Sequence, residues 1–160
     1  MGEHDVNYER VSKFLSDYSY ANNLRDYLLE GDLLFSTVGT TALTSIYKSN
    51  VTAAVAQNII GLRSKKYYPS FLHYLISNST NNSQIKTIQM TGVQFSIKVP
   101  QLLEVDLLVS KCYQEQLKIG SLLASLDHII TLHQRKVKMI NSVLTAIALL
   151  GLYLCSQVHE

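Results

Sequence analysis

The stretch from Ile119 to Ile147, IGSLLASLDHIITLHQRKVKMINSVLTAI, decides the fold of the second part of the chain. Its apolar residues recur at intervals of three or four positions, and His133 and Lys136 are the polar interruptions. This heptad-type pattern predicts one long helix, which we expect to run from Gln114 to about Leu154. A helix of some forty residues spans roughly 60 Å at about 1.5 Å per residue, which is longer than the preceding domain can cover.

The apolar face of this helix therefore needs a partner. It could pack on its own domain, but its length favours pairing with a second long helix. We expect six positions to form that interface: Ile119, Leu122, Leu126, Ile130, Val137 and Ile140.

The end of the helix, residues 143–155, contains no charged residue. A bilayer span needs about 20 apolar residues, and Asn141, Ser142 and Lys138 lie just before this segment. We expect a helix end that is buried against a partner, and a membrane tail anchor is the alternative.

Short apolar runs precede the helix. Residues 33–38, after the turn signal Glu30-Gly31-Asp32, predict a buried strand that Gly39 closes. Residues 42–47 predict its hairpin partner, and residues 58–63 predict a third strand.

One helix and one further strand are expected between this sheet and the long helix. Pro69 suits the first turn of a helix that we expect to end at the polar residues 78–83. The alternation of Val93, Phe95, Ile97 and Val99 is the clearest period-two pattern in the sequence and predicts a strand that Pro100 ends.

Composition bounds the class of protein. The chain has 160 residues, 47% of them hydrophobic, which is enough for one ordinary domain, or a small domain with an appended helix. The net charge of +2 excludes a strongly basic, histone-like DNA binder but allows a local basic patch. Cys112 and Cys155 have no metal-ligand or disulfide spacing, and residues 1–10 lack the apolar core of a signal peptide, so we expect a cytoplasmic protein.

Three segments in this order resemble the specificity (S) subunit of type I restriction-modification systems: TGVQFSIKVP (91–100), YQEQLKIG (113–120) and LDHIITLHQRK (126–136). The segments GDLLFS (31–36) and VGT (38–40) are similar to a hairpin of the same family's target-recognition domain, and the resemblance covers roughly residues 24–138. It implies an α+β fold, with a partial target-recognition domain of short strands and a helix at 1–110, followed by one long coiled-coil-type helix at 111–160. A complete S subunit has two such domains and two helices, so the chain resembles a half or truncated subunit that lacks the first part of its recognition domain.

The resemblance implies a non-catalytic subunit that binds double-stranded DNA and docks methyltransferase subunits, with restriction subunits as a further candidate partner. It would pair with itself or another S-type fragment through the long helix. Arg63, Lys65 and Lys66 could neutralise phosphates, although a solvated loop explains them equally well. The donors and acceptors that could read base edges are Thr40, Thr41, Gln57, Asn58 and Gln94.

The residues indicate no catalytic site. His128 and His133 are five positions apart, where a pair of metal ligands on a helix would be three or four apart, and no acidic residue completes a zinc motif. No nucleophile elbow, P-loop or Asn/Asp-Pro-Pro-Tyr/Phe motif is present, so we expect neither cofactor nor metal. The alternative function is a helical interaction protein or a tail-anchored membrane protein with no role on DNA.

Overall fold

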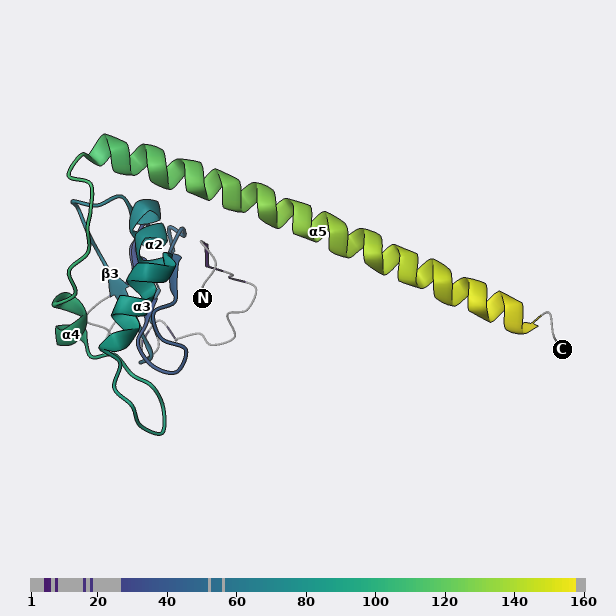
Figure 1. Ribbon diagram of the computed structural model, residues 1–160, viewed down its shortest axis with the longest axis horizontal. Coiled ribbons are helices and arrows are strands. Elements are labelled where there is room, and N and C mark those ends of the chain that lie inside the picture. Colours follow the sequence, from purple (N-terminus) through teal and green to yellow (C-terminus); the bar gives the residue numbers. More distant parts are fainter. Residues whose placement is uncertain are drawn as a thin grey trace. The chain divides into compact units, whose positions relative to one another are not determined.

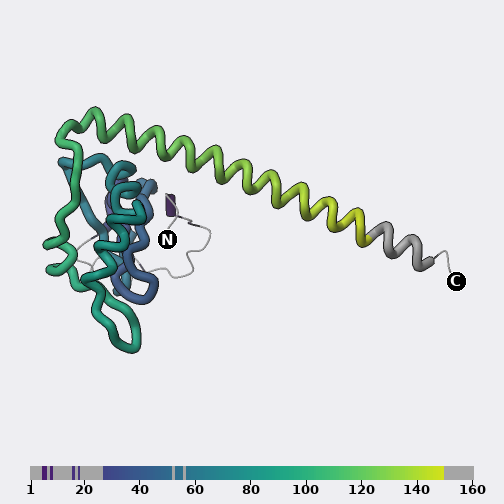
Figure 2. The backbone as a smooth tube through the Cα atoms, in the orientation of Figure 1, coloured from purple at the N-terminus to yellow at the C-terminus, as the bar shows by residue number. Residues whose placement is uncertain are grey.

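The computed structural model describes residues 27–51, 53–55 and 57–149, the backbone of the last helix on to residue 157, and five positions near the N-terminus. The tyrosine-rich residues 1–22 lie mostly outside this set. Within it, two compact units are distinguished, residues 1–123 and 124–160. Figures 1 and 2 show the short elements of the first unit and the long helix that begins in it.

The first unit is built on a three-stranded antiparallel sheet of order β2-β1-β3. The strands are β1 (Leu33–Ser36), β2 (Thr44–Ile46) and β3 (Ile59–Leu62), so all three expected strands are confirmed. In the register, Leu33 lies opposite Ile46 on one side and Leu62 on the other.

The central strand β1 is buried along its whole length. Side chains alternate between the two faces of a strand, and here Leu33 and Phe35 join one core cluster while Leu34 joins another with Leu28 and Tyr47. Helix α2 (Pro69–Ser77) packs on the first face and adds Ile76 to its core. Both faces of β1 are therefore covered, as its unbroken apolar run requires.

Helix α2 begins at Pro69 as expected, but the polar residues after it do not form a loop. They fold into a second helix, α3 (Ser79–Thr87), which the sequence interpretation missed. The side chain of Asn78 accepts a hydrogen bond of 3.0 Å from the Thr80 N–H and so caps this helix. The burial of Ile85 in the core stabilises α3 despite its weak apolar pattern.

The strand expected from Val93 to Val99 is wrong. Ser96 makes only isolated bridges, to Val38 and Met90, and residues 92–94 form a bend. Ile97 is buried, whereas Val93 is fully exposed. Pro100 does not end a strand; it lies in the first turn of the short helix α4 (Val99–Leu103).

The long helix α5 (Tyr113–Gln157) has 45 residues and confirms the helix expected from the heptad pattern. Its first turns, up to Leu123, belong to the first unit. Among the described residues, no helix is both long and apolar enough to cross a membrane. The boundary between domains that we expect at residue 110 stays a prediction.

Two residues hold the start of α5 in the first unit. The fully buried side chain of Gln116 accepts a hydrogen bond of 2.9 Å from the Tyr68 N–H and donates one of 2.7 Å to the Ser110 carbonyl. One turn later, Gly120 lies so close to α2 that a Cβ atom there would be 2.7 Å from the Phe71 nitrogen. The sequence interpretation did not predict this buried contact of Gln116.

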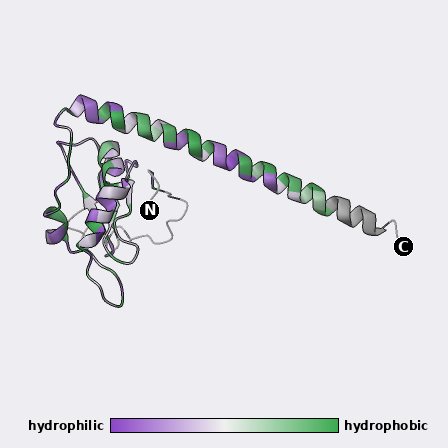
Figure 3. Cartoon of the chain, in the orientation of Figure 1, coloured by the Kyte–Doolittle hydropathy of each residue, from purple (hydrophilic) through white to green (hydrophobic). Residues whose placement is uncertain are grey.

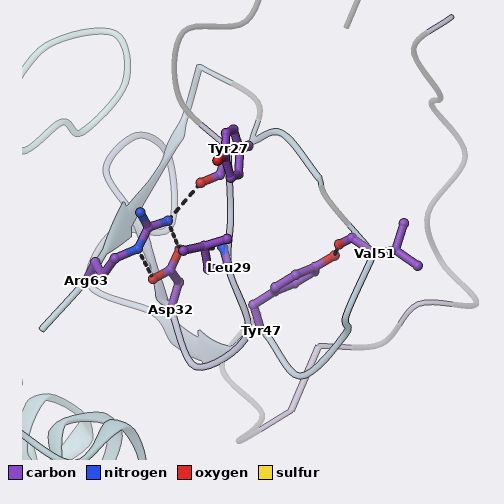
Figure 4. A network of polar contacts seen from close by, with 6 residues as sticks. All are labelled: Tyr27, Leu29, Asp32, Tyr47, Val51 and Arg63. Carbon is purple, nitrogen blue, oxygen red and sulfur yellow. Dashed lines mark hydrogen bonds and ion pairs between the residues drawn. The ribbon is translucent and has the colours of Figure 1, made fainter. Parts of the chain in front are cut away.

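An ion pair between the half-exposed Arg63 and the buried Asp32 fixes the residue before β1. The carboxylate of Asp32 accepts hydrogen bonds from Arg63 Nε at 2.8 Å and Nη2 at 2.7 Å, and a third from the Leu29 N–H (Figure 4). Burial alone would raise the pKa of Asp32, but these hydrogen bonds and the charge of Arg63 outweigh it and lower the pKa below its ordinary value of 3.8.

We expect Asp32→Asn to lower the free energy of unfolding at neutral pH by about 1–2 kcal/mol, a range that allows for the half-exposed Arg63. A depressed folded-state pKa stabilises the fold above the unfolded value and ceases to do so as pH falls through the folded value. The difference between wild type and variant in urea denaturation should therefore shrink between about pH 5 and pH 2. A difference that stays constant over that range would contradict this assignment.

We expect Gly120→Ala to destabilise the chain, although alanine normally favours a helix over glycine by about 1 kcal/mol. The added methyl group would also lie 2.9 Å from the Tyr68 ring, so backbone or ring must move, at a cost of roughly 1–3 kcal/mol. Thermal denaturation measures the effect. The control is Gly92→Ala, where the nearest atom is 3.7 Å from the new Cβ, and a Gly120→Ala variant more stable than wild type would refute the close approach.

Candidate nucleic-acid interface

The eight residues expected to contact a nucleic acid fall at two opposite ends of the sheet. Ser36 at the end of β1 lies opposite Ile59 at the start of β3. The turn after β1 and the residues before β3 are therefore neighbours, which brings Thr40 and Thr41 to the same end as Gln57 and Asn58. Arg63 and the residues after it follow the other end of β3.

A third segment joins the first end. The Thr37 N–H donates to the Asn58 carbonyl at 2.8 Å, and the Gly39 N–H donates to the Phe95 carbonyl at 2.9 Å. The Ile97 N–H donates back to the Thr37 carbonyl at 2.8 Å. Three backbone segments that are far apart in sequence thus meet here. We call them the loop end of the sheet: residues 37–43, 57–58 and 89–98.

The loop end contains all five residues that we expect to contact base edges. Four of these are exposed: Thr40, Gln57, Asn58 and Gln94. Thr41 differs, because it is 2% exposed and its hydroxyl accepts a hydrogen bond of 2.8 Å from Gln89 Nε2. Thr41 therefore positions the segment that leads to Gln94 and is not itself part of the surface.

The turn after β1 has a constrained backbone. Gly39 has a φ of 80° and Ala42 a φ of 59°. The Ser36 hydroxyl donates to the Thr40 carbonyl at 2.7 Å and accepts from the Leu43 N–H at 2.9 Å. The Ser36 side chain thus bonds the backbone on both sides of the turn, and these hydrogen bonds fix the loop that carries Thr40.

The third segment forms a closed loop between α3 and α4. The Met90 N–H donates to the Ser96 carbonyl at 2.8 Å, and the Ser96 N–H donates back at 3.3 Å. The loop extends past the sheet (Figures 1 and 2). Its outer residues, 91–95, are all exposed.

The other end of the sheet carries Arg63, Lys65 and Lys66, and we call it the basic end. Arg63 is committed to Asp32 and also donates to the Tyr27 carbonyl at 2.8 Å, so it serves the fold (Figure 4). Lys65 and Lys66 are exposed, and Lys66 Nζ lies 5.3 Å from the centre of the Tyr67 ring.

Figure 4 also shows a contact near this end that involves no charge: the Tyr47 hydroxyl donates a hydrogen bond to the Val51 carbonyl.

The sequence carries an electrostatic signal that the interpretation missed. Residues 33–103 contain no aspartate or glutamate, so the near-neutral total hides a local excess of positive charge. Lys48 and Arg63 pair with Asp5 and Asp32 respectively. The other cationic side chains of this segment are Lys65, Lys66, Lys86 and Lys98.

The apolar positions of α5 are exposed. The exposed fractions are 38% for Ile119, 62% for Leu122, 46% for Leu126, 53% for Ile130, 48% for Val137 and 46% for Ile140. Apolar segments recur along the described part of the helix (Figure 3). An exposed apolar face that extends over several helical turns is typical of a helix that pairs with another protein surface.

No group of three or more metal-ligating side chains occurs in the part of the chain that the structure describes. His128 and His133 both lie on α5 and are exposed. These observations leave the loop end, the basic end and the apolar face of α5 as the candidate functional surfaces.

The comparison with known protein families identifies the family to which the chain belongs. The family model of the type I restriction modification DNA specificity domain matches residues 3–142. The chain belongs to this family. The match includes both ends of the sheet and most of α5, and it is wider than the range 24–138 expected from the motifs. No curated protein matches the chain.

Membership confirms the resemblance, and the three-stranded sheet with its helices confirms the α+β class. A specificity domain of this type indicates the DNA-recognition component of a type I restriction-modification system. The segments 91–100 and 113–120, on which the resemblance rests, form the extended loop with the start of α4 and the docked start of α5.

Proposed function

We propose that the chain is a DNA-recognition and scaffolding component of a type I restriction-modification complex, acting in the cytoplasm as a half or truncated specificity subunit. The observation that carries this proposal is the loop end of the sheet. There, one tied surface presents Thr40, Gln57, Asn58 and Gln94 in a chain of the specificity family.

The side chains at the loop end have the chemistry for reading bases. Amide groups donate and accept together, which suits paired contacts to adenine, and threonine can contact either kind of base pair. Base contacts specify a sequence, whereas phosphate contacts supply most of the affinity. Because Lys98 is the only Lys or Arg in the sequence of the loop end, the isolated chain binds weakly, and strong binding needs further subunits.

The basic end adds phosphate contacts in this proposal. Strand β3 spans roughly 10 Å, at about 3.3 Å per residue, and Lys65 and Lys66 follow its last residue at the end away from the loop end. In this proposal one duplex extends from the loop end past β3 to these two lysines. Arg63 holds Asp32 and keeps β3 in place beside them.

Replacing Lys65 and Lys66 by alanine should weaken binding of all duplexes by a similar factor. The slope of log affinity against log salt should fall by about 0.9 for each phosphate that is no longer neutralised, and the preferred sequence should not change. Titration of labelled duplex DNA at several salt concentrations measures both. Arg63 is left intact because its removal would disturb the fold. An unchanged salt slope would show that Lys65 and Lys66 do not contact the DNA.

The second part of the proposal concerns α5. Its apolar face would pair with the helix of another specificity chain, either a second copy or another fragment, and the pair would dock methyltransferase subunits and through them restriction subunits. Leu126, Ile130 and Val137 are each about half exposed in the single chain. Burying one such side chain stabilises an assembly by about 1.5–3 kcal/mol when the burial is complete.

Replacing Leu126 and Ile130 together by aspartate should disperse the assembly, because two charges would enter the apolar interface. Sedimentation at tens of micromolar, about the range of weak but useful interfaces, measures it. The control, Thr131→Asp with Ser142→Asp, adds the same charge on the opposite face of a helix with 3.6 residues per turn. A wild-type chain that sediments as a monomer would show that self-association does not occur.

A further inference from the structure

The outermost part of the loop end carries apolar side chains. Val93 is fully exposed, and Phe95 is 53% exposed. Single exposed apolar residues are common, but these two lie in one loop whose base is tied at Met90, Ser96 and Gly39. A loop fixed in this way presents its side chains to a partner without a large cost in conformational entropy.

Lysines bracket the same loop. Lys86 lies in the last turn of α3, and Lys98 is the N-cap residue of α4. Both are exposed, and no acidic residue occurs between them or in the neighbouring turn 37–43. The apolar residues of the loop are therefore flanked by positive charge and by polar side chains such as Thr40 and Gln94.

This combination fits a duplex better than a protein partner. Protein interfaces are depleted of lysine, whereas interfaces with DNA are rich in positive charge. Apolar side chains that enter a groove contact thymine methyl groups or base edges. Lysines on either side of the groove can then contact phosphates.

We propose that the loop of residues 90–96 enters a groove of double-stranded DNA, with Val93 and Phe95 in apolar contact with the bases and Lys86 and Lys98 on the flanking phosphates. This inference rests on the proposed DNA-recognition function and names the specificity-determining loop. Val93 and Phe95 contribute to sequence choice, and the two lysines contribute affinity without sequence preference.

The test uses the full chain, with and without a type I methyltransferase subunit, and a pool of randomised duplexes at low salt. Val93→Ser should lower affinity by about fivefold to tenfold and change the enriched sequences while leaving the salt slope unchanged. Its full exposure means that the fold does not depend on it. The matched control is Leu108→Ser, because Leu108 is 96% exposed and lies outside the loop end.

The lysines give a second readout. Replacing Lys86 and Lys98 by alanine should lower the salt slope by about 0.9 for each phosphate that is no longer neutralised and leave the enriched sequences as they are. A slope equal to that of wild type would overturn this half of the proposal.

The other outcomes separate this inference from the proposed function. If wild type binds the pool and Val93→Ser matches Leu108→Ser in affinity and enriched sequence, the loop does not read DNA, although the DNA-recognition function stands. If Val93→Ser fails only to bind the methyltransferase subunit, the loop is a protein contact and the inference fails. If wild type does not bind the pool in either condition, the proposed function itself fails.

Discussion

Burial of β1 on both faces is the constraint on which the first unit depends. Phe35 and Leu33 are almost fully enclosed on one face, and Leu34 packs with Leu28 and Tyr47 on the other. A four-residue strand can be covered in this way only if β2 and β3 occupy its edges and α2 lies over it. The close pairing of β1 with both neighbours also decides that the turn after β1 and the residues before β3 emerge together. The loop end of the sheet follows from this arrangement.

The two ends of this small sheet carry different kinds of contact. One end of the sheet carries structural contacts beside the exposed Lys65 and Lys66: Arg63 neutralises the buried Asp32, and Gln116 joins the start of α5 to the residues before α2. The opposite end presents polar loops that are tied to one another by backbone hydrogen bonds. Loops on a rigid scaffold are where binding residues concentrate, because loop side chains can vary without cost to the core. The acid-free segment 33–103 gives this part of the molecule a positive charge that suits a nucleic acid.

Local patterns in the sequence predicted the three strands, α2 and α5 because each has a strong apolar periodicity or a clear start signal such as Pro69. They failed where tertiary contacts decide. The polar residues 79–87 became helical through one buried side chain, Ile85, and the cap from Asn78. The alternating residues 93–99 did not form a strand, because Ile97 is the only one of their four apolar side chains that is buried in the core. Of the expected contact residues, four reached one surface, but the burial of Thr41 and the pairing of Arg63 with Asp32 depend on residues distant in sequence, which no local pattern reveals.

The central claim, that the loop end of the sheet faces DNA, can be tested on the unaltered chain by photo-crosslinking to short duplexes that carry iodouracil in place of thymine. Trypsin cleaves after Lys86 and Lys98, so the extended loop falls within one peptide, residues 87–98. Mass spectrometry of the irradiated complex then identifies the attached peptide. The account predicts crosslinks to the peptide 87–98 and to the segment that contains Thr40. Crosslinks confined to α5 or to the residues after Leu103 would contradict it.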